Sequence, residues 1–462
     1  MLTLSVSPPK PWSHIWFNAT GPPSVSRCTR IEYLDWQGRD SSRQKTFLLT
    51  CRIPSSEAHL SPKAVSIVSK PCQRTSNLLE LRRHILNPLA SRCMAGRDDD
   101  ALGTSGVNVA TEGIMGSEAT RGSGGDGAQH NDGLRGRKTS CRGRQQRGSG
   151  INPQNKFAGL RQNTSLRWIS NPHFPFPPPS PSYDSNSTAV WATAVCGPAL
   201  YYYNDDFSVR LVEWLELLRA QGFSQVFLLE TDVHPNIQKV LRYYEAHGFL
   251  GITKFSYPYP YINEPSLRRL WKLSDRQRMW AMENAYFTEC LLRHMHLYRF
   301  IAHIDPDEIP MMAKHTSFPV LLTERINRVA RVRHPAAYKL RWFFHYDDLP
   351  SNGTLPEYVW ALRHTRRTKS PAPPMPGFSK SVYDMDVATG VFSHEVLICQ
   401  RGGCAGSHTS IPYKLAYLAH YSKKCGKQCK NPDSTKEDLS LHKYKDQVLP
   451  AVTKVLTNLE LI

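Results

Sequence analysis

Several features are missing from this 462-residue chain, and each absence narrows what it can be. No apolar run reaches the roughly 18 residues that a membrane-spanning helix needs. The opening residues, MLTLSVSPPKPWSHIW, lack the basic segment followed by an apolar one that marks a secretion signal. No two cysteines have the C-x2-C spacing common in zinc ribbons. From the sequence we therefore expect a soluble chain with no visible membrane anchor or secretion signal.

The cysteines number 11, so they cannot all pair within the chain. Six of them follow residue 190, namely Cys196, Cys290, Cys399, Cys404, Cys425 and Cys429. The last four are spaced C-x4-C and C-x3-C, which fits zinc poorly and favours disulfides, with free thiols as the other alternative.

The charge is strongly basic, with a formal net charge of +19. Such a balance favours polyanionic partners, namely nucleic acid, acidic lipid surfaces or phosphorylated substrates, without choosing among them. Many basic residues lie in the first 190 residues, where a solvated basic tail competes with nucleic-acid binding as the explanation.

Composition divides the chain into three parts. Residues 1–95 show short apolar stretches without a sustained period, so we expect little regular structure there. Residues 96–188 are rich in Gly, Ser and Arg and end in the proline-rich stretch NPHFPFPPPSPSY, which predicts a disordered linker. Residues 189–462 are rich in Leu, Tyr, Trp and Phe and should form one globular domain.

The globular part begins with alternating strand and helix patterns. Strands are predicted at 189–196, 225–230, 250–257 and 298–304, and helices at 208–221, from Pro235 onward and at 274–295. A strand–helix–strand–helix–strand order implies a mostly parallel, Rossmann-like α/β sheet flanked by helices.

Three carboxylates follow the last predicted strand. Asp305, Asp307 and Glu308 stand where ligands bind in open parallel sheets, outside the carboxyl ends of the strands. In an extended chain Asp305 and Asp307 would project to the same side, with Pro306 stiffening the segment between them. Carboxylates this close repel one another unless a cation intervenes, and hard oxygen ligands suit Mg²⁺ or Mn²⁺. We therefore predict a divalent-metal site that includes Asp305 and Asp307.

Four segments of this domain together resemble glycosyltransferase family 92, formerly a domain of unknown function. The segments are FSVRLVEWLELLRAQGFSQVFLLE, TECLLRHMHLYRFIAHIDPDEI, FSKSVYDMDVATGVFSHEV and LAHYSKKC. They carry an E-W-x-E helix, a cysteine helix with D-x-D-E, a Lys-Ser pair with a downstream His, and a His-Tyr. The match covers roughly half the chain, from Trp191 to about Cys429.

The resemblance implies a GT-A-like fold, a UDP-sugar donor (UDP-galactose first), and Mn²⁺ as the usual cofactor. It also implies inverting transfer of a hexose onto a glycan acceptor by a Golgi membrane protein. This sequence shows no anchor helix, and it carries Pro306 inside the D-x-D-E motif.

The same resemblance and the local chemistry suggest site residues. His420 could complete the metal shell, and Lys380 could bind the donor diphosphate beside Asp305. Inverting transfer requires a group that accepts the acceptor's proton. The candidates are His394, Glu395, Asp386, Asp347 and Asp348, and the sequence does not choose among them.

Two further sets of residues have competing explanations. Trp342 or Tyr346 could stack on an acceptor sugar, although strand core explains the same alternation. Glu213 and Trp214 are interpreted as architectural.

Three other functions compete with this reading. A strand ending in D-x-D also opens haloacid-dehalogenase-like phosphohydrolases, although these prefer Thr or Val where this chain has Glu308. A non-catalytic basic protein could bind nucleic acid through its N-terminal region. A transferase fold could also have lost its activity, with Pro306 distorting the carboxylate pair.

Overall fold

The computed structural model describes the chain as two compact units. The first comprises residues 1–31, 49–108 and 113–165, and the second residues 32–48, 109–112 and 166–462. The residues described are 11–17, 21–34, 47–75, 79–80, 106–111, 190–201, 204–257, 263–329, 335–349, 353–374, 377–400, 404, 408–422, 424–425 and 432–462. The predicted linker, residues 96–188, lies outside the described residues except for one strand.

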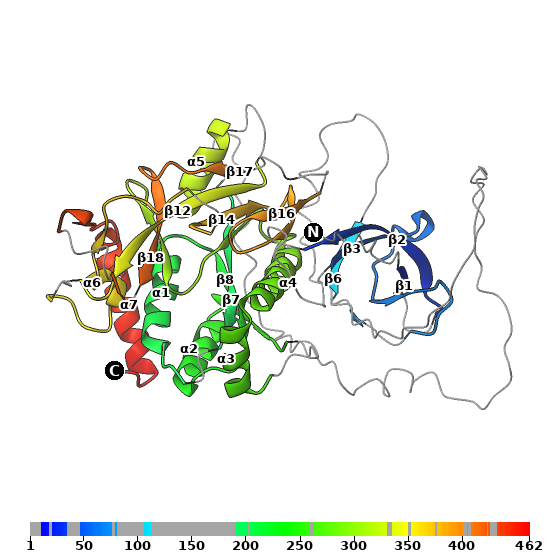
Figure 1. Cartoon of the computed structure of the whole chain (residues 1–462), viewed down its shortest axis with the longest axis horizontal. Helices are drawn as coiled ribbons and strands as arrows, with labels where there is room; N and C mark the ends of the chain where they lie inside the picture. The colour runs from blue at the N-terminus through cyan, green and yellow to red at the C-terminus, as the bar shows by residue number, and fades with distance from the viewer. Residues whose placement is uncertain are drawn as a thin grey trace. The chain divides into compact units, whose positions relative to one another are not determined.

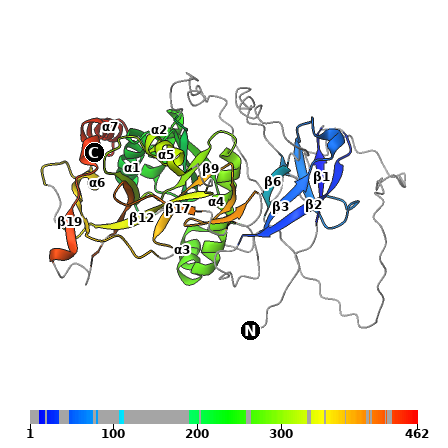
Figure 2. The ribbon, with the colours of Figure 1, turned by 90° about the horizontal axis from the view of Figure 1, so that it is seen from above.

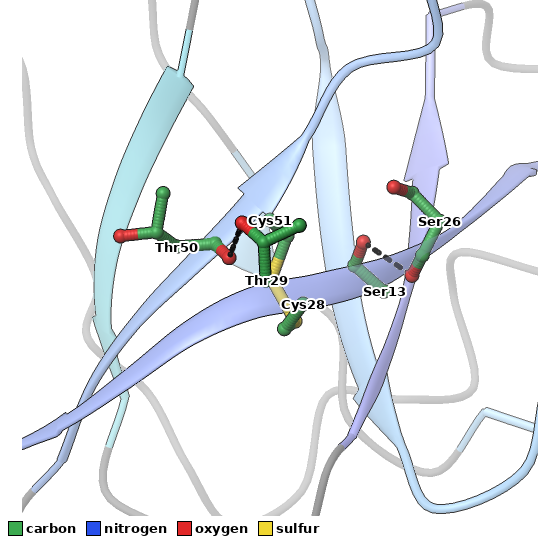
Figure 3. The surroundings of a disulfide bond; sticks show 6 residues. All are labelled: Ser13, Ser26, Cys28, Thr29, Thr50 and Cys51. Carbon is green, nitrogen blue, oxygen red and sulfur yellow. Dashed lines mark hydrogen bonds between the residues drawn. A yellow bond between two sulfur atoms is a disulfide. The ribbon is translucent and has the colours of Figure 1, made fainter.

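The first unit holds most of a six-stranded sheet with the order β5-β4-β1-β2-β3-β6. Its strands are β1 (Trp12–Trp16), β2 (Ser24–Tyr33), β3 (Phe47–Arg52), β4 (Ala64–Val68), β5 (Leu79–Glu80) and β6 (Gly106–Thr111). The Cys28–Cys51 disulfide joins β2 to β3, beside the hydrogen bond from Thr29 Oγ1 to the Thr50 carbonyl (Figure 3). We expected little regular structure in residues 1–95, so these strands differ from the expectation. Strands of about five residues are too short to show a clear alternation of apolar and polar residues in the sequence, yet they can still pair in a sheet.

The second unit is built on an eleven-stranded sheet whose main path runs β11-β18-β12-β14-β10-β7-β8-β9. Strands β7, β8, β12, β14 and β18 of this sheet are labelled in Figure 1. The strands on this path are β7 (Thr193–Leu200), β8 (Gln225–Glu230), β9 (Leu250–Lys254), β10 (Phe300–His303), β11 (Glu308–Met312), β12 (Ala337–Tyr346), β14 (Ser379–Asp384) and β18 (Ala416–Ser422). Two short strands, β13 (Arg366–Thr368) and β17 (His408–Ser410), pair with β12, and β19 (Thr435–Glu437) pairs with β13. Strands β15 (Ala388–Val391) and β16 (Val396–Cys399) form a separate pair.

Seven α-helices are described in this unit: α1 (Ser208–Ala220), α2 (Pro235–Ala246), α3 (Pro265–Ser274), α4 (Arg276–His294), α5 (Phe318–Val329), α6 (Trp360–Arg363) and α7 (Lys445–Asn458). Short 3₁₀ turns lie at Ser55–Glu57, Pro432–Ser434 and His442–Tyr444. No helix among the described residues is long and apolar enough to cross a bilayer.

Alternating side chains place helices on both faces of the sheet. In β7, Val195 packs into the core shared with α1, α2, α5 and α7, whereas Ala194 and Cys196 pack into the core shared with α4. Successive strand residues point to opposite faces, so a strand buried on both sides is apolar throughout. Figure 2 shows α1, α2, α5 and α7 gathered on one side of the sheet and α4 on the other.

The predicted parallel half is present. Strands β9, β8, β7 and β10 are all parallel neighbours, and their chain order gives the spatial sequence third, second, first, fourth. This confirms the α/β prediction, and the order supports the GT-A-like assignment, which stays a prediction.

The sheet as a whole is mixed, which differs from the mostly parallel sheet that we expected. Strand β14 is antiparallel to both β10 and β12, and β11 is antiparallel to β18. Between β12 and β14 the described α-helix is the four-residue α6, which is too short for the crossover that parallel neighbours require, so these two strands pair antiparallel.

Candidate active site

A pocket of about 290 Å³ opens where the strand order reverses, between β7 and β10. The carboxyl end of β7 supplies Pro198 and Ala199 to its wall, and the segment after β10 supplies Asp305 and Asp307. The register of β7 against β8 shifts between Cys196 and Ala199, so β7 is irregular at the pocket. Open α/β sheets bind ligands at this kind of switch point.

The carboxylate segment is a turn and not the extended chain that we predicted. The amide of Glu308 donates to the carbonyl of Asp305 at 2.9 Å, which closes a four-residue turn. Pro306 occupies the second position of this turn, where its fixed φ is favoured. Asp305 and Asp307 nevertheless both line the pocket. The proline therefore suits the local backbone, while its effect on metal binding stays a prediction.

Lys380 lies in β14, two residues before Val382, which is paired with Ala302 of β10. Its ammonium is 2.7 Å from Asp305 Oδ2 and 3.8 Å from Glu308 Oε2, and its side chain is 3% exposed. We predicted that Lys380 would bind a diphosphate; the described contacts are instead with these two carboxylates, although Lys380 also lines the pocket.

Glu308 supports the turn from beneath. Its side chain is fully buried, and its Oε2 accepts a hydrogen bond from the Asp305 amide at 2.9 Å. Its carbonyl accepts from the Trp214 indole of α1 at 2.9 Å. Glu213 accepts from the Ala361 amide at 2.7 Å and also from Leu362 at the start of α6. Glu213 and Trp214 thus bond to backbone groups, in keeping with an architectural role.

His420 reaches the carboxylates through the second half of the sheet. In the β11–β18 ladder it is the partner of Glu308, and its Nε2 lies 3.9 Å from Asp307 Oδ2. The Trp342 ring from β12 stacks on its imidazole at 4.3 Å between centroids. His420 is therefore next to Asp307, as the metal prediction requires.

The first three of the five base candidates, His394, Glu395 and Asp386, occupy different places. His394 lines the pocket, and its Nδ1 lies 2.8 Å from the Ser379 carbonyl. Glu395 is bound to Lys339 at 3.1 Å and is not among the pocket residues. Asp386 is 67% exposed and pairs with Arg299. Arg299 directly precedes β10, whereas Asp305 follows that strand, so Asp386 lies at the opposite end of β10 from Asp305.

The two remaining base candidates are also engaged elsewhere. Asp347 pairs with Arg210 at 3.3 Å, and Asp348 accepts from the Cys425 amide at 3.0 Å. Neither contributes to the pocket wall.

Burial and neighbouring charges set the protonation of the pocket. Burial alone would raise the pKa of Asp305, but the Lys380 ammonium outweighs it and holds that pKa below the usual value. Burial and then the charge of Asp305 raise the pKa of Asp307 to about 7, although solvent reaches 48% of this side chain and moderates the shift. Burial lowers the pKa of His394 to about 3 and that of His420 to about 4. Both imidazoles are therefore neutral at pH 7.

The sequence profile of glycosyltransferase family 92 matches residues 192–457, which is more than half of the chain. The chain belongs to glycosyltransferase family 92. The glycosyltransferase domain thus contains the whole second sheet, the pocket and all seven helices. Family membership leaves the phosphohydrolase alternative without support, whereas nucleic-acid binding by the N-terminal region stays a prediction.

Searches beyond the family profile add little to this membership. No curated protein matches the chain. Among solved structures, residues 1–349 of S. aureus TarS in complex with UDP-GlcNAc are 10% identical, with 50% of this chain and 59% of that chain covered and a TM-score of 0.24. The S. cerevisiae mannosyltransferase Ktr4p is 10% identical, with 34% and 40% covered and a TM-score of 0.21. The chain thus spans less than two thirds of these proteins, and likenesses this low carry no argument.

The side chains of the pocket show what could bind the predicted metal ion. Among the described residues, no group of three His, Cys, Asp or Glu side chains is arranged to hold a metal ion by itself. Asp307 and His420 are neighbours, while Asp305 Oδ2 is engaged by Lys380. Magnesium-like ions often take one or two carboxylates and complete their shell with substrate phosphates and water. These residues therefore fit a cation that binds together with a diphosphate.

Sequence reasoning missed part of the pocket wall. Trp280, Glu283 and Phe287 of α4 line the pocket, together with Tyr201 after β7. Their spacing along α4, three and then four residues, is that of one helix face. The spacing of these residues could be seen in the sequence. The neighbouring face of α4, which is buried in the core, has the more apolar side chains and so determined the prediction for this helix.

The cysteine prediction is confirmed for the described pairs of this domain. Cys196 of β7 is bonded to Cys290 of α4, and Cys399 to Cys404. Cys425 is also disulfide-bonded, while Cys429 lies outside the described residues.

Proposed function

We propose that this family-92 domain transfers a hexose from a UDP-sugar, UDP-galactose first, onto a glycan acceptor with inversion. The observation that carries this proposal is the pocket at the β7–β10 switch point, with Asp305 and Asp307 in its wall and Lys380 beside them. An anionic diphosphate needs a cationic or metal partner, and the carboxylates of this pocket would hold a divalent cation for it.

Asp305, Asp307 and His420 would hold the cation, Mn²⁺ or Mg²⁺, against the donor diphosphate. A cation bound there would neutralise negative charge on the departing diphosphate. Lys380 keeps Asp305 ionised and fixes the direction of its carboxylate through the 2.7 Å ion pair. Glu308 holds the turn itself through the Asp305 amide.

His394 is the proposed acceptor of the proton because, among the candidate bases, it is the one in the pocket wall. Its pKa of about 3 makes it a weak base, so it would take the proton late in the transfer, when the bond to the anomeric carbon has made the acceptor oxygen acidic. In the transfer the acceptor oxygen forms a bond to the anomeric carbon, the bond to the diphosphate breaks, and the acceptor's proton must leave. If Nδ1 of His394 donates to the Ser379 carbonyl, Nε2 is the basic nitrogen of the neutral ring. Glu395 and Asp386 were equal candidates in the sequence, but their ion pairs lie outside the pocket wall.

Trp342 is proposed as the surface on which the acceptor sugar stacks. It lines the pocket, and it is fixed from behind by the stacked imidazole of His420. Tyr346, the other candidate, is buried away from the pocket wall, so strand core explains it.

A secretory-pathway location, the Golgi by family resemblance, is proposed with this function. The disulfides Cys28–Cys51, Cys196–Cys290 and Cys399–Cys404 support it, because disulfides persist in oxidising compartments. Microscopy of the tagged full chain with compartment markers tests this; a cytosolic distribution would contradict it.

The decisive experiment is a screen of UDP-hexoses with Mn²⁺ on the full chain. We expect Asp307→Asn to lower kcat/KM by about 100-fold or more, because an interaction with developing charge is lost. Asp305→Ala and His394→Gln should be similarly impaired. NMR of the product should show the anomeric configuration inverted relative to the donor.

Asp386→Asn is the matched control, because Asp386 is an exposed aspartate remote from the pocket. It should keep activity within about threefold of wild type, as surface changes usually do. Equal turnover of the wild type, Asp305→Ala and Asp307→Asn would overturn the proposed metal and donor site.

A further inference from the structure

Helix α4 supplies three side chains to the pocket wall that the proposed mechanism leaves without a role. Trp280 and Glu283 are half-buried, whereas Phe287 is buried against the ring of His303, with 3.4 Å between the ring centroids. The three residues follow one another at intervals of three and four, so they lie on one face of the helix. Trp280 and Glu283 are therefore the two residues of this face with side-chain surface that a ligand in the pocket can touch.

Two described contacts fix α4 against the sheet. Cys290 is disulfide-bonded to Cys196 of β7. The Thr288 hydroxyl donates to the Val391 carbonyl at 3.1 Å and accepts from the Val391 amide at 3.0 Å, which joins the helix to β15. Both contacts lie within about two helical turns of Glu283. The carboxylate of Glu283 is thus presented to the pocket from a fixed helix, and selective binding requires such a rigid support.

The pocket wall holds more acidic than basic groups. Among its described residues, Glu283, Asp305 and Asp307 are acidic. Lys380 is the one cation among them at pH 7, because burial lowers the pKa of His394 to about 3. A divalent cation shared with a diphosphate is matched by the negative charges of the phosphates, so it does not offset Glu283 as well. The part of the pocket beside α4 therefore stays negative when the donor is bound.

The position of Glu283 indicates which part of the donor it faces. Burial acts to lower the pKa of Lys380, but its carboxylate neighbours, Asp305 first and Glu283 among them, raise that pKa above the usual value. Glu283 thus lies within electrostatic reach of the ammonium that is 2.7 Å from Asp305 Oδ2. The donor diphosphate would bind at Asp305 through the cation, and the hexose is attached directly to that diphosphate. The hexose is therefore the part of the donor next to Glu283.

We propose that Glu283 is a specificity-determining residue, which accepts hydrogen bonds from hydroxyls of the transferred hexose and rejects sugars that carry a carboxylate. Hydrogen bonds to an ionised acceptor are about twice as strong as those between neutral groups. A uronic acid would instead place a second carboxylate beside Glu283, and like charges this close repel each other. Trp280 covers the ring of the same hexose, because sugars offer apolar faces to aromatic rings. This inference rests on the proposed function, since it requires a UDP-hexose in the pocket.

Calorimetric titration of the full chain in the presence of Mn²⁺ tests this inference and needs no acceptor. The ligands are UDP, UDP-galactose and UDP-galacturonic acid, which differs from UDP-galactose by a carboxylate at C6. We expect the wild type to bind UDP-galactose about tenfold or more tightly than UDP-galacturonic acid. Glu283→Gln should bind UDP-galactose about tenfold more weakly and reduce that preference to about threefold or less, with its affinity for UDP unchanged. Trp280→Ala should weaken the binding of both UDP-sugars and not that of UDP.

Glu289→Gln is the matched control on the same helix. Glu289 pairs with Arg293 and is not among the pocket residues, so this variant should bind all three ligands like the wild type. Glutamine has nearly the shape of glutamate, so the thermal unfolding of Glu283→Gln should match that of the wild type.

Three results would overturn the inference. An unchanged preference between the two UDP-sugars in Glu283→Gln would show that the sugar does not contact this carboxylate. An equal loss of affinity for UDP would place Glu283 at the diphosphate instead. In both cases the proposed function would stand. A wild type that binds neither UDP nor UDP-galactose would contradict the proposed function itself, and the role of Glu283 with it.

Discussion

At the scale of single residues, Lys380 has the most demanding environment in the pocket. It is 3% exposed, and its charge is compensated by Asp305 and Glu308. Removing one member of a buried charge pair leaves the other without compensation, which commonly costs about 3–5 kcal/mol. Lys380 is therefore expected to act through Asp305, as a positioning residue.

Lys380→Met should lower both stability and activity. The loss of its charge leaves Asp305 beside Asp307 without the lysine, but Asp305 is 30% exposed and solvent screens part of the repulsion. We therefore expect the free energy of unfolding to fall by about 2 kcal/mol, less than for a fully buried pair. Turnover of the UDP-sugar should fall by about 100-fold, as when a transition-state electrostatic contact is lost. Urea unfolding and steady-state kinetics measure the two effects.

Lys339→Met is the control for this substitution. Lys339 also pairs with a carboxylate, Glu395, but outside the pocket wall. It should lower activity by no more than about threefold, as expected for a pair that is not in contact with the reaction. Equal losses in the two variants would contradict the special role of Lys380.

At the scale of elements, the contact between α1 and α6 depends on one buried carboxyl. Glu213 accepts hydrogen bonds from two backbone amides in the first turn of α6, where amides have no partner within the helix. Burial raises its pKa to about 7, from an ordinary value of 4.5, against the lowering effect of these hydrogen bonds. Ionisation of Glu213 in the folded protein is therefore unfavourable.

The sign of the pH effect follows from this shift. Below pH 4.5 Glu213 is protonated in both states, and its full contribution to stability is present. As the pH rises from 4.5 through about 7, the unfolded state releases the proton first and stability is lost. The total loss is on the order of 3 kcal/mol.

Glu213→Gln removes this titration. Comparing urea unfolding at pH 4.5 and pH 8, we expect the wild type to lose about 3 kcal/mol more than the variant does. The exposed Glu357→Gln should follow the wild type. A wild type and a Glu213→Gln variant with parallel pH profiles would show that the helix contact does not depend on this proton.

Elements also show how far the sequence could lead. The predicted strand 225–230 coincides with β8, and the predicted helix 208–221 with α1, because each has a strong apolar period and clear end signals. The second half of the sheet was not predicted. The partnership of Glu308 with His420 joins residues 112 positions apart through a strand ladder, and no local pattern encodes such a pairing.

The site was predictable to the same extent. Asp305 and Asp307, which line the pocket, were predicted because they directly follow a buried strand, and His420 and Lys380 were predicted only through the family resemblance. Asp386 and Glu395 lie outside the pocket wall, which could not be predicted because the sequence does not reveal which side of the sheet, or which end of a strand, a loop carboxylate occupies.

At the scale of the whole molecule, each unit carries its own disulfide. Cys196–Cys290 ties β7 to α4 in the second unit, and it closes a span of 94 residues. Cys28–Cys51 closes 23 residues in the sheet of the first unit. A longer loop loses more chain entropy when it is closed, so the first of these should stabilise its unit more.

Replacing both Cys196 and Cys290 by Ala should lower the free energy of unfolding of the transferase unit by about 2–4 kcal/mol. Activity should fall as well, because α4 supplies Trp280 and Glu283 to the pocket. Thermal unfolding and UDP-sugar turnover measure these effects. The Cys28→Ala, Cys51→Ala variant is the control; if it impairs turnover as much, the two units depend on each other.

The pairing of β11 with β18 also has a consequence for biosynthesis. The carboxylates at 305 and 307 leave the ribosome more than a hundred residues ahead of His420, which lies in β18, the last strand on the main path of the sheet. A nascent or prematurely terminated chain that ends before Ala416 has the acidic turn without its histidine neighbour. The domain is thus expected to gain competence only after β18 has left the ribosome, and nonsense mutations before Ala416 should yield inert protein.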